Sequence, residues 1–358
     1  MKISVKSVSA MAFAVGVSTV ALGDTHTFKP NVVASNGWAY WTDVKNWTNE
    51  QGEEEAPAIG DEVIITGNKT IGGCNGTYMA VYYRGSGIGL SGGGFYFQQG
   101  GKGFVYESSG GISYWLNVYA SAGIDTIYDI PTGKTVSSSE NATGAGRILK
   151  RGGGTLQIGT KEQTNSRKYD LGGVVIEGGT FAYANYPLTI SPQLVFSGND
   201  PSCQLKLGSA NITYDNPDFY ETNGVANVDH ALTSDSSSTL AFTGVPKHEV
   251  TAFSGCVLGK LNLRWAPSDA AYELVFSNAV STTTGTLSVD NGTVRLSGGA
   301  TFSALASLVV GAGGTFAVDA GSGQAFKASA ASLADGAKLA LGDNVTLHVT
   351  TLSVNGVD

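Results

Sequence analysis

Apolar and polar residues alternate along much of this chain with a period of two residues. In the segment Val345-Thr346-Leu347-His348-Val349, the apolar side chains fall on one face and His348 falls between them on the other. Successive side chains of a β-strand point to opposite faces, so this alternation predicts short strands with one buried face. No stripe of helical period accompanies it. The pattern therefore predicts an all-β protein, excludes helical and leucine-rich repeats, and places His348 in solvent.

A Gly-Thr-apolar-x-apolar unit recurs along the chain at nearly regular steps. Its copies are Gly154-Thr155-Leu156-Gln157-Ile158, Gly179-Thr180-Phe181-Ala182-Tyr183, Gly292-Thr293-Val294-Arg295-Leu296, Gly314-Thr315-Phe316-Ala317-Val318 and a weaker one from Gly336 to Leu341. The step between neighbouring copies suits one coil of a parallel β-helix, whose coils stack at the strand spacing of ~4.8 Å. Glycine takes the turn conformation, and equivalent threonines should stack in a column. The interval from Thr180 to Thr293 is close to five such steps, so we expect the period to continue through it.

The segment from about Ile71 to Ser139 is richer in aromatic residues, which include Phe95-Tyr96-Phe97. We interpret its long alternating stretch, Ile112 to Ser121, as a strand of the early coils. There Trp115, Asn117 and Tyr119 share one face, and at ~3.3 Å per residue the two rings should lie ~13 Å apart, with a polar group between them. These three residues are the candidate glycan-binding site. The alternative is that this face packs beneath a loop or against another sheet.

Residues 1–23 have the order of a secretory signal peptide. Lys2 and Lys6 precede an apolar stretch of 15 residues from Val8 to Leu22, and a small-x-small sequence ends at Gly23. A membrane-spanning helix needs ~20 apolar residues, so this stretch should be removed and should not anchor the protein. We expect the mature chain to begin near Asp24, outside the cytoplasm.

Residues 24–70 are predicted to form an N-terminal cap, followed by a parallel β-helix over residues 71–358. Three of the five tryptophans lie in the cap segment: Trp38, Trp41 and Trp47. A solenoid needs an atypical unit at its end, because the first coil otherwise leaves core side chains and strand edges bare. The coil pattern stays strong to the last residues, so we expect the solenoid to continue beyond Asp358. Its open last coil should be able to self-associate.

Two glycine-rich segments carry a family resemblance. They are Lys150-Arg151-Gly152-Gly153-Gly154-Thr155-Leu156-Gln157-Ile158 and Gly172-Gly173-Val174-Val175-Ile176-Glu177-Gly178-Gly179-Thr180-Phe181. They resemble the autotransporter-associated β-strand repeat of bacterial surface and exported proteins, K-x-G-x-G-T-L-x-L, a variable loop, then G-G-x-x-V-x-x-G-T-L. Trp41-Thr42-Asp43 with Asn46-Trp47, and Pro57 with Gly60-Asp61-Glu62-Val63, similarly resemble the W-x-D-x-x-N-W and P-x-x-G-D-x-V segments that open such proteins. The resemblance is clear in these segments and looser across the C-terminal third, and it implies a passenger-like right-handed β-helix.

The composition agrees with an ordered, exported β-protein. The chain has 50 Gly, only 9 Pro and 42% apolar residues, which argues against disorder. Its net charge of −8 makes nucleic acid a poor partner. The run Glu53 to Glu55 is best explained as a solvated loop. Cys203 and Cys256 should lie about two coils apart, too far for a disulfide, so we expect them and Cys74 to be thiols.

The sequence lacks the clustered residues that carbohydrate chemistry requires. Glycoside cleavage needs two carboxylates that face one bond, and no Asp-Asp pair or Gly-His-Gly is present. His230 beside Asp229 suggests a base and its partner, but no nucleophile turn supports it, and a surface-loop histidine is the preferred interpretation. The glycines from Gly85 to Gly89 lack the Lys-Ser/Thr of a phosphate loop and should be turns.

We therefore expect an all-β, right-handed parallel β-helix (a pectin-lyase-like solenoid) with an aromatic-rich N-terminal cap. Its expected function is that of an exported bacterial structural or adhesive surface element, without catalytic residues, cofactor or metal. The alternatives are a glycan-binding module that uses outward aromatic residues, and a carbohydrate-active enzyme of the same fold. Expected partners are host or bacterial surface glycans or proteins, and no integral membrane segment is expected in the mature chain.

Overall fold

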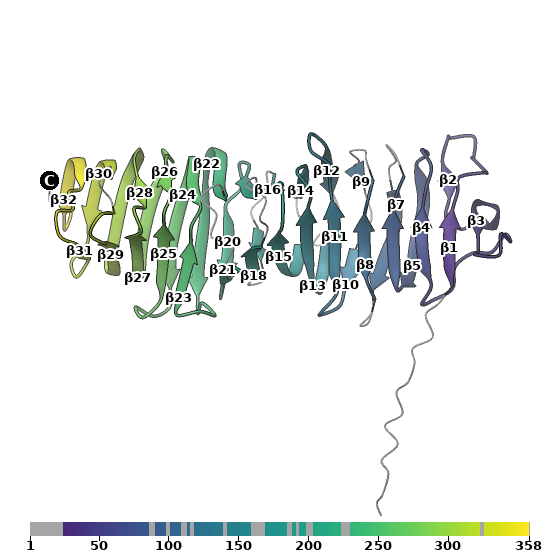
Figure 1. The fold of residues 1–358 in the computed structure, drawn as a ribbon, viewed down its shortest axis with the longest axis horizontal. Coiled ribbons are helices and arrows are strands. Elements are labelled where there is room, and N and C mark those ends of the chain that lie inside the picture. Colours follow the sequence, from purple (N-terminus) through teal and green to yellow (C-terminus); the bar gives the residue numbers. More distant parts are fainter. Residues whose placement is uncertain are drawn as a thin grey trace, which may run out of the picture.

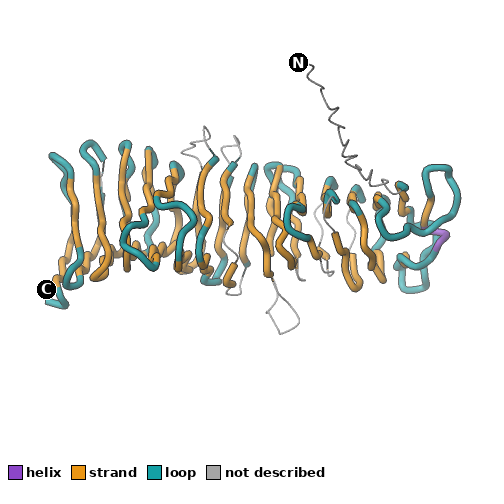
Figure 2. Tube along the Cα trace, turned by 90° about the horizontal axis from the view of Figure 1, so that it is seen from below, coloured by secondary structure: helices purple, strands orange, loops and turns teal. Residues whose placement is uncertain are grey.

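Short parallel strands stack along one axis to form an elongated β-solenoid (Figure 1). The computed structural model is 60% strand and 1% helix, which confirms the all-β parallel prediction. The structure describes residues 24–85, 90–97, 101–108, 113–114, 118–138, 142–158, 169–184, 188–190, 193–197, 203–222, 230–322 and 326–357. Seen from below, the strands form successive rungs that are joined by loops at the corners (Figure 2).

The described strands fall on three faces of the solenoid. The first face contains β9 (Ser113–Tyr114), β12 (Thr135–Ser138), β14 (Thr155–Ile158), β16 (Thr180–Tyr183), β19 (Gln204–Leu207), the first parts of β22 (Ala231–Gly244) and β24 (Cys256–Pro267), β26 (Val280–Ser281) and β28 (Thr301–Phe302). The second face contains β5 (Ile71–Tyr78), β7 (Leu90–Phe97), β10 (Val118–Ala120), the first parts of β13 (Ala142–Arg151) and β15 (Tyr169–Ile176), β17 (Leu188–Ile190), β20 (Ile212–Asp215), the second parts of β22 and β24, the first parts of β27 (Thr286–Ser297) and β29 (Leu305–Val318), β30 (Lys327–Leu333) and β32 (His348–Val354).

The third face begins at the N-terminal end of the solenoid and follows the whole described chain. It contains β1 (Thr25–Phe28), β4 (Glu62–Ile65), β6 (Ala80–Tyr83), β8 (Gly103–Tyr106), β11 (Asp125–Asp129), the second parts of β13 and β15, β18 (Gln193–Phe196), β21 (Asp218–Glu221), β23 (Val250–Phe253), β25 (Glu273–Ser277), the second parts of β27 and β29, and β31 (Lys338–Leu341). Strands such as β13 and β22 bend around a corner and so serve two faces.

The recurring Gly-Thr unit sets the register between coils. Thr155 pairs with Thr180 and Leu156 with Phe181, one coil later. Leu156 and Phe181 are fully buried, whereas the threonines lie on the outer side. The predicted threonine column and inward apolar residues are therefore confirmed for these coils.

The later copies of the unit lie on a different face from the earlier ones. Thr293 pairs with Thr315, and Phe316 with Leu339, on the third face, whereas Thr155 belongs to the first. The coil period continues through the gap as expected, but the two groups of copies do not form one column. The cause is a longer coil: β21 begins at Asp218, and its neighbour β23 begins only at Val250.

A cluster of packed aromatic rings fills the N-terminal end of the core. The ring centroids of Trp41 and Trp47 lie 4.6 Å apart, and Phe28 contacts both. β3 (Trp47–Thr48) pairs antiparallel with β1, and so covers the strand edge at which parallel stacking begins. Parallel pairing already starts between β1 and β4, so the first rungs lie inside the segment expected to be only a cap.

The W-x-D-x-x-N-W segment has a clear structural role in this end unit. The carboxylate of Asp43 accepts a hydrogen bond from the backbone N–H of Lys45, at the start of the 3₁₀ helix η1 (Val44–Asn46). The side chain of buried Asn46 accepts from the N–H of Val32, which anchors the preceding loop. The indole N–H of Trp47 donates to the carbonyl of Trp41 at 2.7 Å. These bonds fold the segment into a compact cover.

The cysteines lie as far apart as the period predicts. The carbonyl oxygen of Cys203 accepts a hydrogen bond from the N–H of Ala231, which in turn pairs with Cys256 in the following coil. Two strand spacings are ~10 Å, beyond the ~7 Å between Cα atoms that a disulfide spans. Cys74 and Cys203 are buried, and Cys256 is half-buried.

Candidate functional site

Two tyrosine rings on neighbouring coils form a stacked pair on the second face. The ring centroids of Tyr96 and Tyr119 lie 4.5 Å apart, with an angle of 7° between the ring planes. Tyr96 is 42% exposed and Tyr119 is half-buried. The pair therefore reaches the surface through the exposed Tyr96 and in part through Tyr119.

Strand alternation and register together place these rings outside the core. Phe95 and Phe97, on either side of Tyr96 in β7, are buried, and so are Val118 and Ala120 in β10. Because Tyr96 and Tyr119 occupy paired positions in parallel strands, their rings stack along the solenoid axis.

A shallow cavity of ≈ 520 Å³ adjoins the stacked tyrosines. Its lining consists of Thr77, Tyr96, Phe97, Tyr119, Ala120, Ser121, Ala122, Gly144 and Ala145. The coil that follows Tyr119 carries small residues here, and Gly144 is required, since a Cβ at this position would lie 2.2 Å from the carbonyl oxygen of Ala120. Small residues therefore make up much of the lining beside the stacked pair.

Of the three residues that the sequence grouped as a glycan site, the structure describes Tyr119. Tyr119 lies on an outward position as expected, whereas Trp115 and Asn117 lie outside the described residues. The stretch from Ile112 to Ser121 is not one strand: β9 pairs with β12 on the first face, and β10 pairs with β7 on the second. The two described parts of the stretch, β9 and β10, therefore lie on different faces of the solenoid.

Tyr96 is the residue that sequence reasoning missed. The signal was present, because Tyr96 precedes Tyr119 by one coil step and lies between two apolar residues in Phe95-Tyr96-Phe97. Applying the period to outward aromatic residues as well as to the Gly-Thr unit would have paired them.

A second group of polar residues gathers around β21, where the coil is longest. Asp218 accepts hydrogen bonds from Lys247 and His248, both at 2.9 Å. Glu221 accepts from the Nδ1 of His230 at 2.8 Å and from the hydroxyl of Ser254 at 2.6 Å. Both carboxylates are thus held by partners from the following coil.

The expectation that His230 is a surface-loop histidine is wrong. Its ring is fully buried and lies 5.4 Å from the ring of Phe196. A buried imidazole requires a hydrogen-bond partner, which Glu221 supplies. By contrast, His348 is exposed, as the alternation predicted.

Comparisons with protein-family models, with curated proteins and with solved structures give no match. Within the described residues, none of the helical segments has the length and apolar character needed to cross a membrane, and none of the groups of His, Cys, Asp and Glu has the arrangement of a metal site.

Proposed function

We propose that this protein is exported from a bacterium and acts outside the cytoplasm as a structural or adhesive surface element. The observation that carries the proposal is the continuous stacking of the third face from β1 to β31, which makes the molecule a rod with long outward surfaces (Figure 1). Such a rod presents side chains at the ~4.8 Å strand spacing over a large area, as a scaffold or adhesin requires.

Ion pairs between neighbouring coils on the outward side of the third face support this role. Arg84 pairs with Glu107 at 2.7 Å and Arg147 with Asp125 at 2.9 Å, in each case across neighbouring coils. Exposed pairs of this kind add little stability. Their effect is to present a polar, mixed-charge surface that remains hydrated along the rod.

The test of the adhesive role combines localisation with adhesion. Cells that express the full chain are fractionated, and beads coated with the purified protein are passed over immobilised surface glycans and matrix proteins. We expect the protein outside the cytoplasm and coated beads retained above albumin-coated beads. Retention in the cytoplasm with Met1 intact, or retention of coated beads no better than the control, contradicts the proposal.

A glycan-binding module is the second candidate, and the Tyr96–Tyr119 stack favours it. Aromatic rings that carry a polar group bind sugar rings through their apolar surface and through hydrogen bonds to the hydroxyls. We expect Tyr96→Ala and Tyr119→Ala each to weaken glycan binding about tenfold, since each removes a ring contact. Tyr40→Ala is the matched control, because Tyr40 is 39% exposed in the end unit, away from the cavity. Equal binding by all four proteins on a glycan array contradicts this candidate.

A carbohydrate-active enzyme is not proposed. Asp218 and Glu221, which both belong to β21, are each held by cationic or hydroxyl partners. We expect no release of unsaturated or reducing sugar from pectin or alginate. Release that disappears in Asp218→Asn or Glu221→Gln, with the thermal midpoint unchanged, would overturn this expectation.

A further inference from the structure

We propose that a pocket at the C-terminal end of the solenoid binds the anionic group of an acidic polysaccharide, through Lys327 and His348. The pocket has a volume of ≈ 460 Å³ and lies between β28, β29, β30 and β32. It lies far along the axis from the Tyr96–Tyr119 stack (Figure 1). The inference deepens the proposed adhesive role, and rests on it for the class of ligand.

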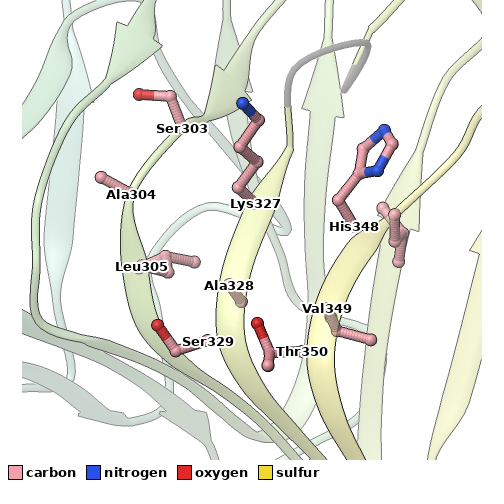
Figure 3. Close-up of a pocket in the computed structure, with 10 residues that line it drawn as sticks. Ser303, Ala304, Leu305, Lys327, Ala328, Ser329, His348, Val349 and Thr350 are labelled. Carbon is pink, nitrogen blue, oxygen red and sulfur yellow. The ribbon is translucent and has the colours of Figure 1, made fainter.

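Lys327 and His348 occupy paired positions in β30 and β32. Paired residues of parallel strands point to the same side of the sheet, ~4.8 Å apart, and both residues are exposed. Figure 3 shows the Lys327 amino group and the His348 ring on the same side of the two strands. The two nitrogen-bearing groups can therefore approach one ligand group together.

Two residues with hydroxyl groups follow the basic residues on the same strands, β30 and β32. Ser329 and Thr350 lie two residues further along β30 and β32, ~6.6 Å from the basic pair, and both are exposed. The four residues form a grid with basic groups on one row and hydroxyls on the next (Figure 3). The carboxylate or sulfate of a sugar fits the basic row, and the hydroxyls of that sugar fit the second row.

The preceding coil contributes Ser303, Ala304 and Leu305 to the lining of the pocket. Leu305 pairs with Ala328, so Ala304 occupies the column of Lys327 in that coil. A methyl group there leaves space beside the long Lys327 side chain. Within the described part of the chain, the salt bridges involve other cations and do not engage Lys327 or His348.

The electrostatic context favours an anion at this position. Two neighbouring basic groups repel one another when both are charged, and an anion between them removes that repulsion. The net charge of the protein is −8, which opposes the approach of acidic chains, but salt screens this repulsion beyond about 10 Å, whereas the basic pair acts at contact distance.

The experiment measures binding of the purified full-length chain to polygalacturonate, which carries carboxylates, and to heparin, which carries sulfates. Lys327→Gln and His348→Gln are compared with Lys338→Gln. This control removes an exposed lysine from β31, on the third face, and so changes the net charge of the protein as Lys327→Gln does. Thermal midpoints confirm that each variant is folded.

We expect binding to at least one polymer, about tenfold weaker in Lys327→Gln and in His348→Gln, and within twofold of the wild type in Lys338→Gln. A preference for heparin identifies the bound group as sulfate, and a preference for polygalacturonate identifies it as carboxylate. Equal weakening by Lys338→Gln, or no effect of any variant, overturns the site. If neither polymer binds while coated beads still adhere, the site is wrong and the adhesive role stands; if neither polymer binds and the beads do not adhere, both proposals fail.

Discussion

Lys150 and Gly178 lie in neighbouring coils, and the ammonium group of Lys150 donates a 3.0 Å hydrogen bond to the carbonyl oxygen of Gly178. The same group donates to the carbonyls of Arg151 and Gly152 in its own turn. Lys150 is fully buried. A buried ammonium group is tolerated only when its donors are satisfied, and here three carbonyls satisfy them. The lysine of the K-x-G-x-G-T-L pattern thus joins one glycine turn to the next.

Replacing Lys150 with Met should destabilise these coils. The substitution keeps an unbranched side chain of similar length, but leaves three carbonyl groups without their charged donor. We expect the free energy of unfolding to fall by about 3 kcal/mol, measured by urea denaturation. Lys260→Met, at an exposed position of β24, is the control and should change it by less than about 0.5 kcal/mol. Equal midpoints for the two variants would show that the Lys150 bonds contribute nothing.

The local pattern predicts coil length and side-chain direction, but it does not predict the corners. It pairs Thr155 with Thr180 correctly, because a strict alternation and a glycine turn fix both residues relative to the core. It places Thr293 in the wrong column, because the longer coil between Asp218 and Val250 changes which face the motif occupies. The repeat period gives only the number of residues between copies of the motif. The face on which a copy lies depends also on where the chain turns between strands.

The local sequence pattern likewise predicts only part of the candidate site. Alternation places Tyr119 outside the core, but it also predicts one straight strand from Ile112 to Ser121, whereas β9 and β10 lie on different faces. The sequence also gives no sign that His230 is buried, since its partner Glu221 lies in the preceding coil. Contacts between coils depend on register, which a single motif does not supply.

The mature N-terminus is expected at Asp24, and the structure adds a reason for its position. The backbone nitrogen of Asp24 donates to the carboxylate of Asp61 at 3.1 Å, and the same carboxylate pairs with His26 at 3.1 Å. Cleavage before Asp24 converts this nitrogen to an ammonium group, and hydrogen bonds between charged groups are the stronger kind.

Mass spectrometry of the exported protein should therefore find Asp24 as its first residue. Asp61→Asn should lower the thermal midpoint of the cleaved chain more than that of the uncleaved chain, because only the cleaved chain loses an ammonium–carboxylate pair. Glu53→Gln, in the exposed loop of the end unit, is the control. Equal losses in the two forms, or an exported protein that retains Met1, would contradict this assignment.

In a chain of residues 24–358, β31 and β32 expose apolar side chains that favour self-association. Leu339 and Leu341 in β31 are 40% and 45% exposed, and Leu352 and Val354 in β32 are 47% and 45% exposed. Bare strand edges with apolar neighbours are templates for other chains. We expect concentration-dependent dimers in sedimentation, and a shift to monomer in Leu341→Lys/Leu352→Lys. Val280→Lys, at an exposed apolar position within the rod, is the control. A wild-type protein that stays monomeric at high concentration contradicts the prediction.

Because two tyrosines are buried deep in the core, we expect the free energy of unfolding to fall in alkaline solution. The hydroxyl groups of Tyr183 and Tyr214 lie 3.0 Å apart, and both residues are fully buried. Burial raises the pKa of Tyr183 well above its usual value, and the neighbouring Tyr214 raises it further. Burial likewise raises the pKa of Tyr214. The pKa of Tyr78 is raised to about 12, again mainly by burial.

The direction of the pH effect follows from these shifts. In the unfolded chain tyrosine loses its proton near pH ~10, whereas in the folded chain the buried tyrosines keep theirs. Above that pH the unfolded state binds fewer protons than the folded state. The contribution of these groups to the free energy of unfolding is therefore complete below pH ~10 and falls as the pH rises, by ~1.4 kcal/mol per pH unit for each such group.

The double variant Tyr183→Phe/Tyr214→Phe removes both hydroxyls together and leaves no unpaired donor. We expect it to show a shallower decline of the urea midpoint between about pH 10 and 12 than the wild type, with Tyr78 still contributing. Tyr40→Phe, at an exposed ring, should leave the slope unchanged. A double variant whose slope equals that of the wild type would mean that these two hydroxyls already ionise in the folded protein, which their complete burial opposes.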